Sequence, residues 1–520
     1  MRARAVDKLD ATSAEGALIM ATDIAAQAPP AGGGTVDKPS VMTILLSAIA
    51  GVISGYFVVG ASIVYWVVAA GGAVSAWIVP RALIQRLPLA WLTASTALTV
   101  YLTQSIPGFF PDLTSPRDIV LQLALVVSLG LLARSYLVYT EYADTFDALK
   151  ASMSGHPLER WLTSVLNHPI DAIFGRVCVA NTLLMLPLTV LVILPDTFNY
   201  LVIFAHATCL LLGLFPQEIV EHQNTHTRVF SPKPGASERV KLMLKVLQFH
   251  FEYVLALLTA RAPNFYRVQH VYVHHVEDNG PLDTHTTLPY YRTSFLDFSR
   301  HALWQSIDLV TGARLLTYLV KKGKQRQIRD VVRGLAIWWA FVLAVALINP
   351  LGALYLFVSR FVGGTYITLI TFYQHGLVDP ADPVPSHGHT TDFVHHDHGN
   401  LGFDYHVEHH TRPARHWTWY YEEHARLAAK DGGGHPAVII EKEKFGPLAF
   451  MAALWRKDYA EIARYAHVHD LPDGNADALA RVLAERARPI GAPDRKGPLA
   501  DIDAVVSRAM AAALPKSFAV

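Results

Sequence analysis

Cysteine and charge are both scarce in this chain of 520 residues, and each shortage excludes a class of protein. The only 2 cysteines, Cys178 and Cys209, both fall within apolar runs. They cannot build a disulfide framework, a four-cysteine zinc site or a cysteine-ligated iron–sulfur cluster. Any electron-carrying cluster must therefore belong to another protein.

Charged residues make up 17% of the chain and apolar residues 52%, a balance that predicts a membrane protein with soluble ends. The formal net charge of +1 provides no field that would attract nucleic acid, so we expect no nucleic-acid partner.

Two metal-binding motifs are also missing. Without His-Glu-x-x-His the sequence lacks the signature of a zinc protease, and without Glu-x-x-His it lacks that of a ferritin-like di-iron bundle.

Apolar runs dominate the first third of the chain after a tail at residues 1–40, which is rich in Ala, Gly and Pro and is predicted to be flexible. Residues 41–80 contain no charge, and because about 20 residues suffice for one span, we expect two. Further spans are predicted at residues 87–106 and 119–139, followed by an amphipathic surface segment up to residue 167. Residues 41–140 are thus predicted to be an N-terminal transmembrane region.

Two helical hairpins are predicted farther along the chain. The first covers residues 177–216 and turns at Pro195-Asp196, and the second joins residues 337–348 to 351–373 at Asn349-Pro350. A basic run at residues 321–329 precedes the second hairpin and is predicted to be cytoplasmic by the positive-inside rule. Because a hairpin returns the chain to the side it left, the segments that flank the hairpins should share one face of the membrane.

Histidine is concentrated in this part of the chain, with 17 of the 25 histidines between positions 222 and 410. Spacings of three and four residues place imidazoles on one face of a helix. One such cluster would suit iron, copper, zinc or nickel. Eight clustered imidazoles exceed the needs of one zinc ion, so a two-metal centre is the simpler interpretation. The three clusters are His222 and His226; His270, His274 and His275; and His406, His409 and His410.

These three clusters, in this order and with apolar helices between them, resemble the histidine boxes of the membrane fatty acid desaturase and alkane hydroxylase superfamily. The resemblance covers roughly residues 177–420. It implies an all-α, polytopic transmembrane bundle with a cytosolic histidine-box domain at residues 141–410, two non-haem iron ions, and O2-dependent attack on an unactivated C–H bond. His375, in Tyr-Gln-His-Gly, matches an additional ligand of the superfamily at the end of a late transmembrane helix. With the eight clustered histidines it completes an implied set of nine metal ligands.

The reaction product is less clearly implied than the metal centre. Three residues separate His270 from His274, a spacing that resembles the alkane hydroxylases. The third cluster, Asp-Tyr-His-Val-Glu-His-His, resembles the desaturases. We expect desaturation of a lipid or hydrocarbon chain, and hydroxylation stays open as the alternative.

Other polar residues near the clusters could orient the ligands. A carboxylate that accepts the far N–H of an imidazole fixes its tautomer, and the candidates are Glu221, Asp283, Asp404 and Glu408. The loop histidines His395, His396 and His398 could give similar support, could lie in a solvated polar loop, or, for His395 or His398, could replace one of the nine ligands.

Residues 411–520 are charged and are predicted to form a cytosolic helical cap, with helices over 416–430, 441–467, 476–488 and 501–514. No His-Pro-Gly-Gly haem-binding element is present, so we expect a separate electron donor: a ferredoxin, a rubredoxin or a cytochrome with its reductase. The alternative from another class is a histidine-rich membrane metal transporter. Such a protein should carry ionisable residues deep in its spans, where this sequence has few.

Overall fold

The computed structural model describes residues 79–105, 115–153, 157–394, 398–429, 435, 437–442, 445–468, 475–491 and 498–514. All of them lie within residues 40–520, which form one compact unit. The predicted tail, nearly all of the two predicted spans at residues 41–80, His395 and His396 lie outside the described residues. The predicted domain boundaries at residues 140 and 410 stay predictions.

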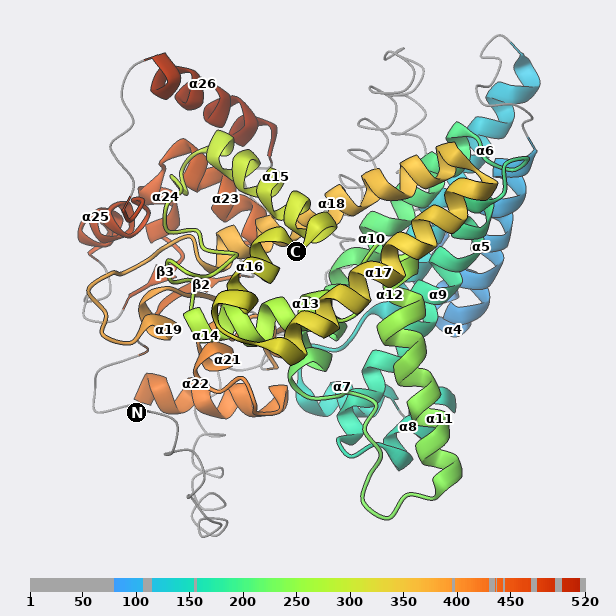
Figure 1. Cartoon of the computed structure of the whole chain (residues 1–520), viewed down its shortest axis with the longest axis horizontal. Helices are drawn as coiled ribbons and strands as arrows, with labels where there is room; N and C mark the ends of the chain where they lie inside the picture. The colour runs from blue at the N-terminus through green and yellow to red at the C-terminus, as the bar shows by residue number, and fades with distance from the viewer. Residues whose placement is uncertain are drawn as a thin grey trace. The chain divides into compact units, whose positions relative to one another are not determined.

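Five described helical segments are long and apolar enough to cross a membrane, which confirms the predicted helical membrane fold. The second of them, Pro169–Ile193, combines the short helix η1 (Pro169–Asp171) with α9. The short helix α4 (Arg81–Arg86) and the apolar helix α5 (Pro88–Gln104) pack against α6 (Figure 1). The five segments contain α6 (Pro116–Thr140), α9 (Ala172–Ile193), α10 (Tyr200–His226), α17 (Gln325–Ile348) and α18 (Pro350–Gln374).

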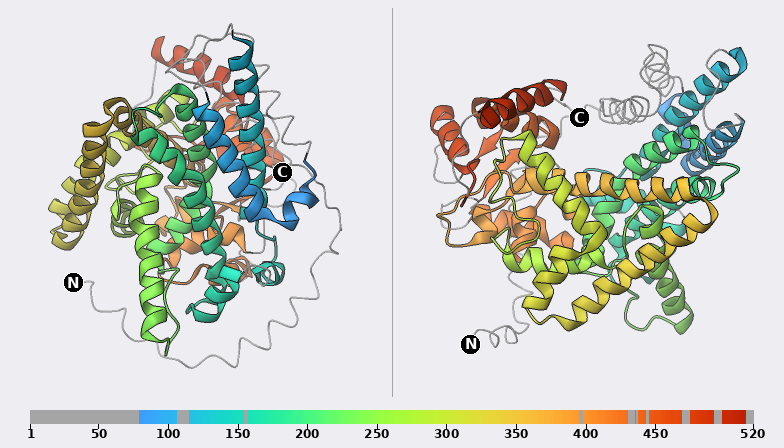
Figure 2. Two further views of the ribbon diagram at one scale, coloured as in Figure 1. Left: turned by 90° about the vertical axis from the view of Figure 1, so that its right-hand side faces the viewer. Right: turned by 45° about the horizontal axis from the view of Figure 1, so that its top comes forward.

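A chain of buried polar side chains joins α6, α9 and α10, which lie side by side in Figures 1 and 2. The hydroxyl of Tyr136 lies 2.7 Å from Oδ1 of Asn181, and Nδ2 of Asn181 donates to Oε1 of Gln217 over 3.0 Å. Hydrogen bonds of this kind hold membrane helices together because apolar side chains gain little by leaving lipid for protein.

The turns of the two hairpins meet at Asn349, between α17 and α18. Its Oδ1 accepts the N–H of Gly352 over 3.1 Å, and its Nδ2 donates to the carbonyl of Val192, near the end of α9, over 2.8 Å. A Cβ atom at Gly352 would lie 2.2 Å from that same carbonyl oxygen, so the close approach requires glycine. Because both turns lie at one end, α10 and α18 both run toward the other end, where His222, His226 and His375 lie.

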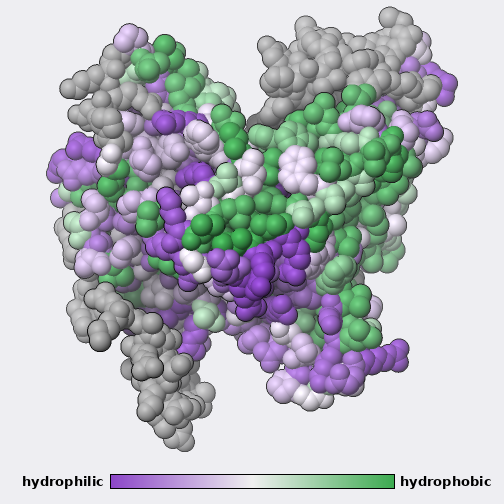
Figure 3. All heavy atoms as spheres, viewed as in Figure 1, coloured by the Kyte–Doolittle hydropathy of each residue, from purple (hydrophilic) through white to green (hydrophobic). Residues whose placement is uncertain are grey.

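Beyond the basic first turns of α17, the outer surface of α17 and α18 is largely apolar, as Figure 3 shows in green. Leu347 is 90% exposed, and Leu343, Leu351 and Leu354 are also exposed, as expected for side chains that face lipid. The helix α17 begins at Gln325, well before the predicted start at residue 337, because the basic run continues directly into its first turns.

Shorter helices connect the two hairpins. The predicted surface segment, which precedes the first hairpin, forms α7 (Phe146–Met153) and α8 (Pro157–Val165). After α10 come α11 (Glu238–Phe249), the π-helix η2 (His250–Leu255), α12 (Ala256–Leu258), α13 (Phe265–Gln269), the π-helix η3 (His270–His274), α14 (His275–Glu277), α15 (Phe295–Thr311) and α16 (Ala313–Lys321). Of these, α15 packs along α18 (Figure 1).

The prediction of one helix over residues 441–467 is wrong. This stretch holds two helices and parts of a three-stranded sheet, in which β1 pairs in parallel with β2 and β2 pairs in antiparallel with β3. Gly446-Pro447 starts a new helix, and Lys457 ends it in the left-handed region at φ 59°. The elements are α19 (Pro385–Gly388), β1 (Thr391–Val394), α20 (Gly399–Gly402), α21 (His406–Thr411), η4 (Trp417–Trp419), α22 (Tyr420–Ala429), β2 (Val438–Glu441), α23 (Pro447–Arg456), α24 (Tyr459–Ala463), β3 (Ala466–His467), α25 (Ala476–Arg486) and α26 (Pro498–Ala513).

Candidate metal centre

The first histidine cluster lies on the last turns of α10, where the helix leaves its apolar stretch. His222 and His226 are four residues apart, so their rings project from one face. Nε2 of His222 lies 2.9 Å from Nε2 of His409, which belongs to the third cluster. The first and last clusters are therefore in direct contact, although 187 positions separate these two residues.

The second cluster occupies the π-helix η3 and the first residue of α14. A π-helix has a wider turn than an α-helix, so residues i, i+4 and i+5 share one face. This geometry fits the spacing of His270, His274 and His275. Nε2 of His275 lies 3.1 Å from Nε2 of His270 and 2.7 Å from Nε2 of His409.

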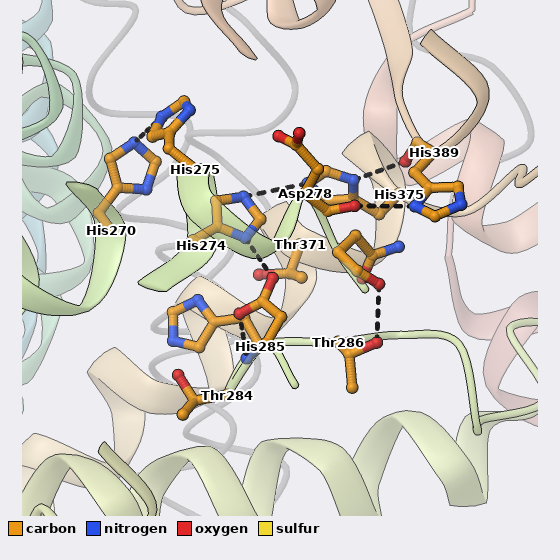
Figure 4. Close-up of polar contacts among 12 residues, drawn as sticks. His270, His274, His275, Asp278, Thr284, His285, Thr286, Thr371, His375 and His389 are labelled. Atoms are coloured by element: carbon orange, nitrogen blue, oxygen red, sulfur yellow. Dashed lines mark hydrogen bonds and ion pairs between the residues drawn. The ribbon is translucent and has the colours of Figure 1, made fainter. Parts of the chain in front are cut away.

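The third cluster lies on α21, and His375 is the residue that follows α18. Nε2 of His375 lies 3.0 Å from Nε2 of His406 and 3.3 Å from Nε2 of His274. Figure 4 shows His274 and His375 facing each other from different segments of the chain. The end of α18 thus reaches the second and third clusters together.

The structure brings all nine predicted ligands together in two groups with His275 between them. Within each group the donor atoms lie within 4.8 Å of one another. The ring of His275 lies 4.3 Å from that of His409 and 4.4 Å from that of His410, measured between centroids, so it borders both groups. The first group is His222, His226, His270 and His409, and the second is His274, His375, His406 and His410.

Burial and mutual proximity favour the neutral form of these imidazoles. The pKa values of His270, His406 and His409 are held well below the usual range. Burial is the larger cause, and the proximity of other imidazoles is the smaller one. The same causes act on His275 and His410. Neutral imidazole is the form that binds metal.

Two buried ring nitrogens also indicate a metal site. Nε2 of His226 and Nε2 of His410 have no hydrogen-bond partner among the described residues. Buried polar atoms are nearly always paired, so unpaired ones require an explanation. The nitrogen donor set and these two atoms fit a pair of transition-metal ions.

Several of the far ring nitrogens are hydrogen-bonded. Oδ2 of Asp283 lies 2.6 Å from Nδ1 of His274, and Oδ1 of Asp278 lies 2.9 Å from Nδ1 of His410. Burial opposes ionisation of Asp283, but the adjacent His274 holds the pKa of this carboxyl below its usual range. Burial raises the pKa of Asp278 to about 6. Nδ1 of His375 lies 2.6 Å from the carbonyl oxygen of His389 (Figure 4).

Residues 201–441 match the family model described as "Fatty acid desaturase". This match supports the resemblance of this part of the chain to the membrane fatty acid desaturase superfamily. The matched range runs from the first turn of α10 to the end of β2, so it contains all three histidine clusters and His375. The family supports a lipid oxidoreductase of the desaturase or hydroxylase type. No curated protein and no solved structure matches the chain.

The other residues predicted to support the nine candidate ligands lie in different surroundings. Asp283 contacts His274, as described above. Glu221 pairs with Arg261, and Asp404 lies 2.8 Å from Nζ of Lys442. Glu408 contacts two histidines outside the nine, and His398 caps the short helix α20 through the N–H of Leu401. His395 and His396 lie outside the described residues.

Sequence reasoning missed Asp278, which follows the second cluster by only three residues. Asp278 and Asn279 both adopt left-handed backbone conformations, at φ 47° and φ 58°. This turn reverses the chain and brings the carboxylate back to His410. An Asp-Asn pair directly after a histidine-rich helix was the available indication, because both residues tolerate that conformation. The phenol of Tyr420, 3.1 Å from Nδ1 of His409, was also missed.

Proposed function

We propose that the protein is a membrane-bound, O2-dependent di-iron oxidoreductase that acts on an unactivated C–H bond of a lipid acyl or alkyl chain. One observation carries the proposal: two groups of four imidazoles, bordered by His275, form at the ends of two apolar helices. The match to the fatty acid desaturase family supports the same class of reaction.

The nine histidines would hold the two iron ions, one in each group. A donor set of imidazole nitrogens suits iron, zinc or copper, so the choice of iron follows from the family. Two iron ions bound there would supply the reduction of O2 with electrons from a donor protein.

The protein's own side chains prepare the donor atoms. The carboxylate of Asp283 accepts a hydrogen bond from Nδ1–H of His274, and the carbonyl of His389 accepts one from Nδ1–H of His375. Both rings therefore present Nε2 with its lone pair to the centre. The side chains of the second group are all buried, which keeps bulk water away from the reacting bond.

A lipid substrate follows from the position of the centre. The helices α10 and α18 are long and apolar enough to cross a membrane, and they end at His226 and directly before His375, so the centre would lie at the membrane surface, next to the alkyl chains of the bilayer. We propose desaturation as the reaction. Hydroxylation is the second candidate, favoured by the three residues between His270 and His274.

We propose that the histidine clusters face the cytoplasm. Exposed basic residues, among them Lys321 at the end of α16 and Arg326 in the first turn of α17, lie at the end of α17 opposite its turn with α18. This is the end at which His375 lies, and cytoplasmic segments carry an excess of Lys and Arg. A separate ferredoxin, rubredoxin or cytochrome with its reductase would dock on this side.

A metal transporter is the alternative from another class. It would need ionisable groups along a path through the spans. Arg360 lies deep in α18, but its guanidinium donates to the carbonyls of Leu309 and Ala260 and is committed to structure. His206 in α10 contacts Thr189 and Tyr355.

Iron content and product analysis test the proposal together. The purified full chain should hold about two iron ions, and His274→Ala or His409→Ala should lower this content. His416→Ala is the matched control, because His416 contacts Asp171 and lies outside both groups. Cells that express the protein should convert labelled acyl or alkyl chains. If no lipid or hydrocarbon loses two hydrogens or gains oxygen, the proposed function is wrong.

A further inference from the structure

A separate cluster of metal-binding side chains lies beside the nine histidines and shares none of them. It consists of Asp392 on β1, Glu408 on α21, His424 on α22 and His435, just before β2. One ligand atom from each residue lies within 4.8 Å of the others. Four separate segments of the chain thus converge on one point.

The distances in this cluster are two hydrogen-bond contacts and two separations close to those of donors around one ion. Nδ1 of His424 and Nε2 of His435 lie 2.7 and 2.8 Å from Oε1 of Glu408. Both nitrogens lie 3.6 Å from Oδ2 of Asp392. In a tetrahedral zinc site with bonds of about 2.1 Å, neighbouring donors are about 3.4 Å apart. The donor atoms of the four side chains therefore lie about as close together as the donors of such a site.

Burial leaves two carboxylates in need of positive charge. The side chains of Asp392 and Glu408 are fully buried, and their only described ion pairs are with His424 and His435. Oδ2 of Asp392 and Oε2 of Glu408 have no hydrogen-bond partner among the described residues. Buried carboxylates are costly unless they are paired or bind metal. Burial opposes protonation of His424, but its hydrogen bonds to Asp392 and Glu408 raise its pKa to about 10, so without metal a proton on His424 balances part of the negative charge. A divalent cation would replace that proton, neutralise both carboxylates and leave both imidazoles neutral.

We propose that Asp392, Glu408, His424 and His435 bind a third metal ion, a divalent transition metal for which Zn²⁺ is the best match. Two imidazoles and two carboxylates complete a four-coordinate shell, which is the arrangement of a structural rather than a catalytic zinc site. Glu408 lies on α21 between His406 and His409. The ion therefore ties the helix of the third histidine cluster to α22 and to the start of β2.

Zinc content tests this assignment independently of the proposed oxidation chemistry. The full chain in detergent is stripped of metal, reloaded with Zn²⁺, freed of excess ion and measured by mass spectrometry. The double variant His424→Ala/His435→Ala should hold one zinc ion fewer per chain than the wild type. His467→Ala is the matched control, because His467 lies on the same small sheet but outside the cluster. An unchanged zinc content in the folded double variant overturns the proposal.

A measurement on the wild type removes any dependence on the folding of the variants. Crystals of the zinc-loaded full chain should give an anomalous difference peak, recorded at the zinc edge, among these four side chains. Its absence overturns the proposal. The proposed di-iron function is unaffected by that result, because zinc or iron at the nine histidines gives peaks elsewhere.

Discussion

Asp283 determines which nitrogen of His274 faces the second group of histidines. Its Oδ2 lies 2.6 Å from Nδ1 of His274, while Nε2 of the same ring lies 3.3 Å from Nε2 of His375. Because the proton sits on the nitrogen that donates to the carboxylate, the lone pair points toward His375 and its neighbours. A buried carboxylate thus prepares a donor atom without contacting the metal position itself.

Replacing Asp283 should weaken metal binding by about 10- to 100-fold, the usual effect of losing such a hydrogen bond. We expect the larger loss for Asp283→Ala. Asp283→Asn should lose less, because its amide oxygen still accepts the N–H of His274. Competition with a chelator measures the affinity. The matched control is Asp308→Ala, a buried aspartate that accepts the N–H of Arg314 away from the histidines. Wild-type affinity in Asp283→Ala would contradict the assigned role.

The sequence allowed the helical hairpins and the eight clustered histidines to be predicted, because both depend on local patterns, whereas His375 was predicted from the resemblance to the superfamily. Apolar runs identify spans whatever their neighbours are. The spacing of His406, His409 and His410 indicates a shared helix face without any tertiary information. The π-helical turn at His270 was not predicted, although its spacing suits a wider turn.

Contacts between distant segments could not be predicted. The strand β1 has four residues and pairs with β2, 47 positions later, so neither strand carries a periodic pattern long enough to recognise. The pairing of Glu408 with His424 and His435 likewise depends on how α22 and β2 return to α21. In the sequence these residues are isolated charges and histidines.

A methyl group at Gly352 should destabilise the meeting point of the two hairpins. In Gly352→Ala the Cβ would lie 2.2 Å from the carbonyl oxygen of Val192, so the helices must shift, at about 1–3 kcal/mol. Gly363→Ala, in the same helix, is the matched control because no described atom beyond the adjacent turns of α18 lies within 4 Å of its added Cβ. Thermal unfolding in detergent, followed by tryptophan fluorescence, should show a lower midpoint for Gly352→Ala alone. Equal midpoints would refute the close approach.

Arg261 should be far more important for stability than an exposed arginine. Its guanidinium pairs with Glu221 and, over 2.6 Å, with Glu218, and both carboxylates lie on α10 just before His222. Arg261→Gln leaves two carboxylates without their cation, and breaking a buried pair costs about 3–5 kcal/mol. In Arg333→Gln, an exposed pair with Asp330 is lost, at about 0–1 kcal/mol. Chemical denaturation in detergent compares the two variants. Similar losses of stability in the two variants would show that water solvates Arg261 and its two carboxylate partners.

Removing one histidine from either group should remove one iron ion and leave the other. His226 belongs to the first group and His406 to the second, and the two groups of four have no residue in common. We therefore expect His226→Ala and His406→Ala each to hold about one iron ion per chain, and the double variant to hold almost none. His250→Ala is the matched control, since His250 contacts Thr182 outside both groups and should keep both ions.

Iron analysis gives the stoichiometry of these variants, and Mössbauer spectra show whether the remaining ion differs between the two single variants. Different spectra are expected because the groups have different neighbours: Tyr420 beside His409 in the first, and Asp283 beside His274 in the second. Loss of both ions from either single variant would show that the groups act as one cooperative site, with His275 linking them. Retention of both ions would exclude the replaced histidine from the ligand set.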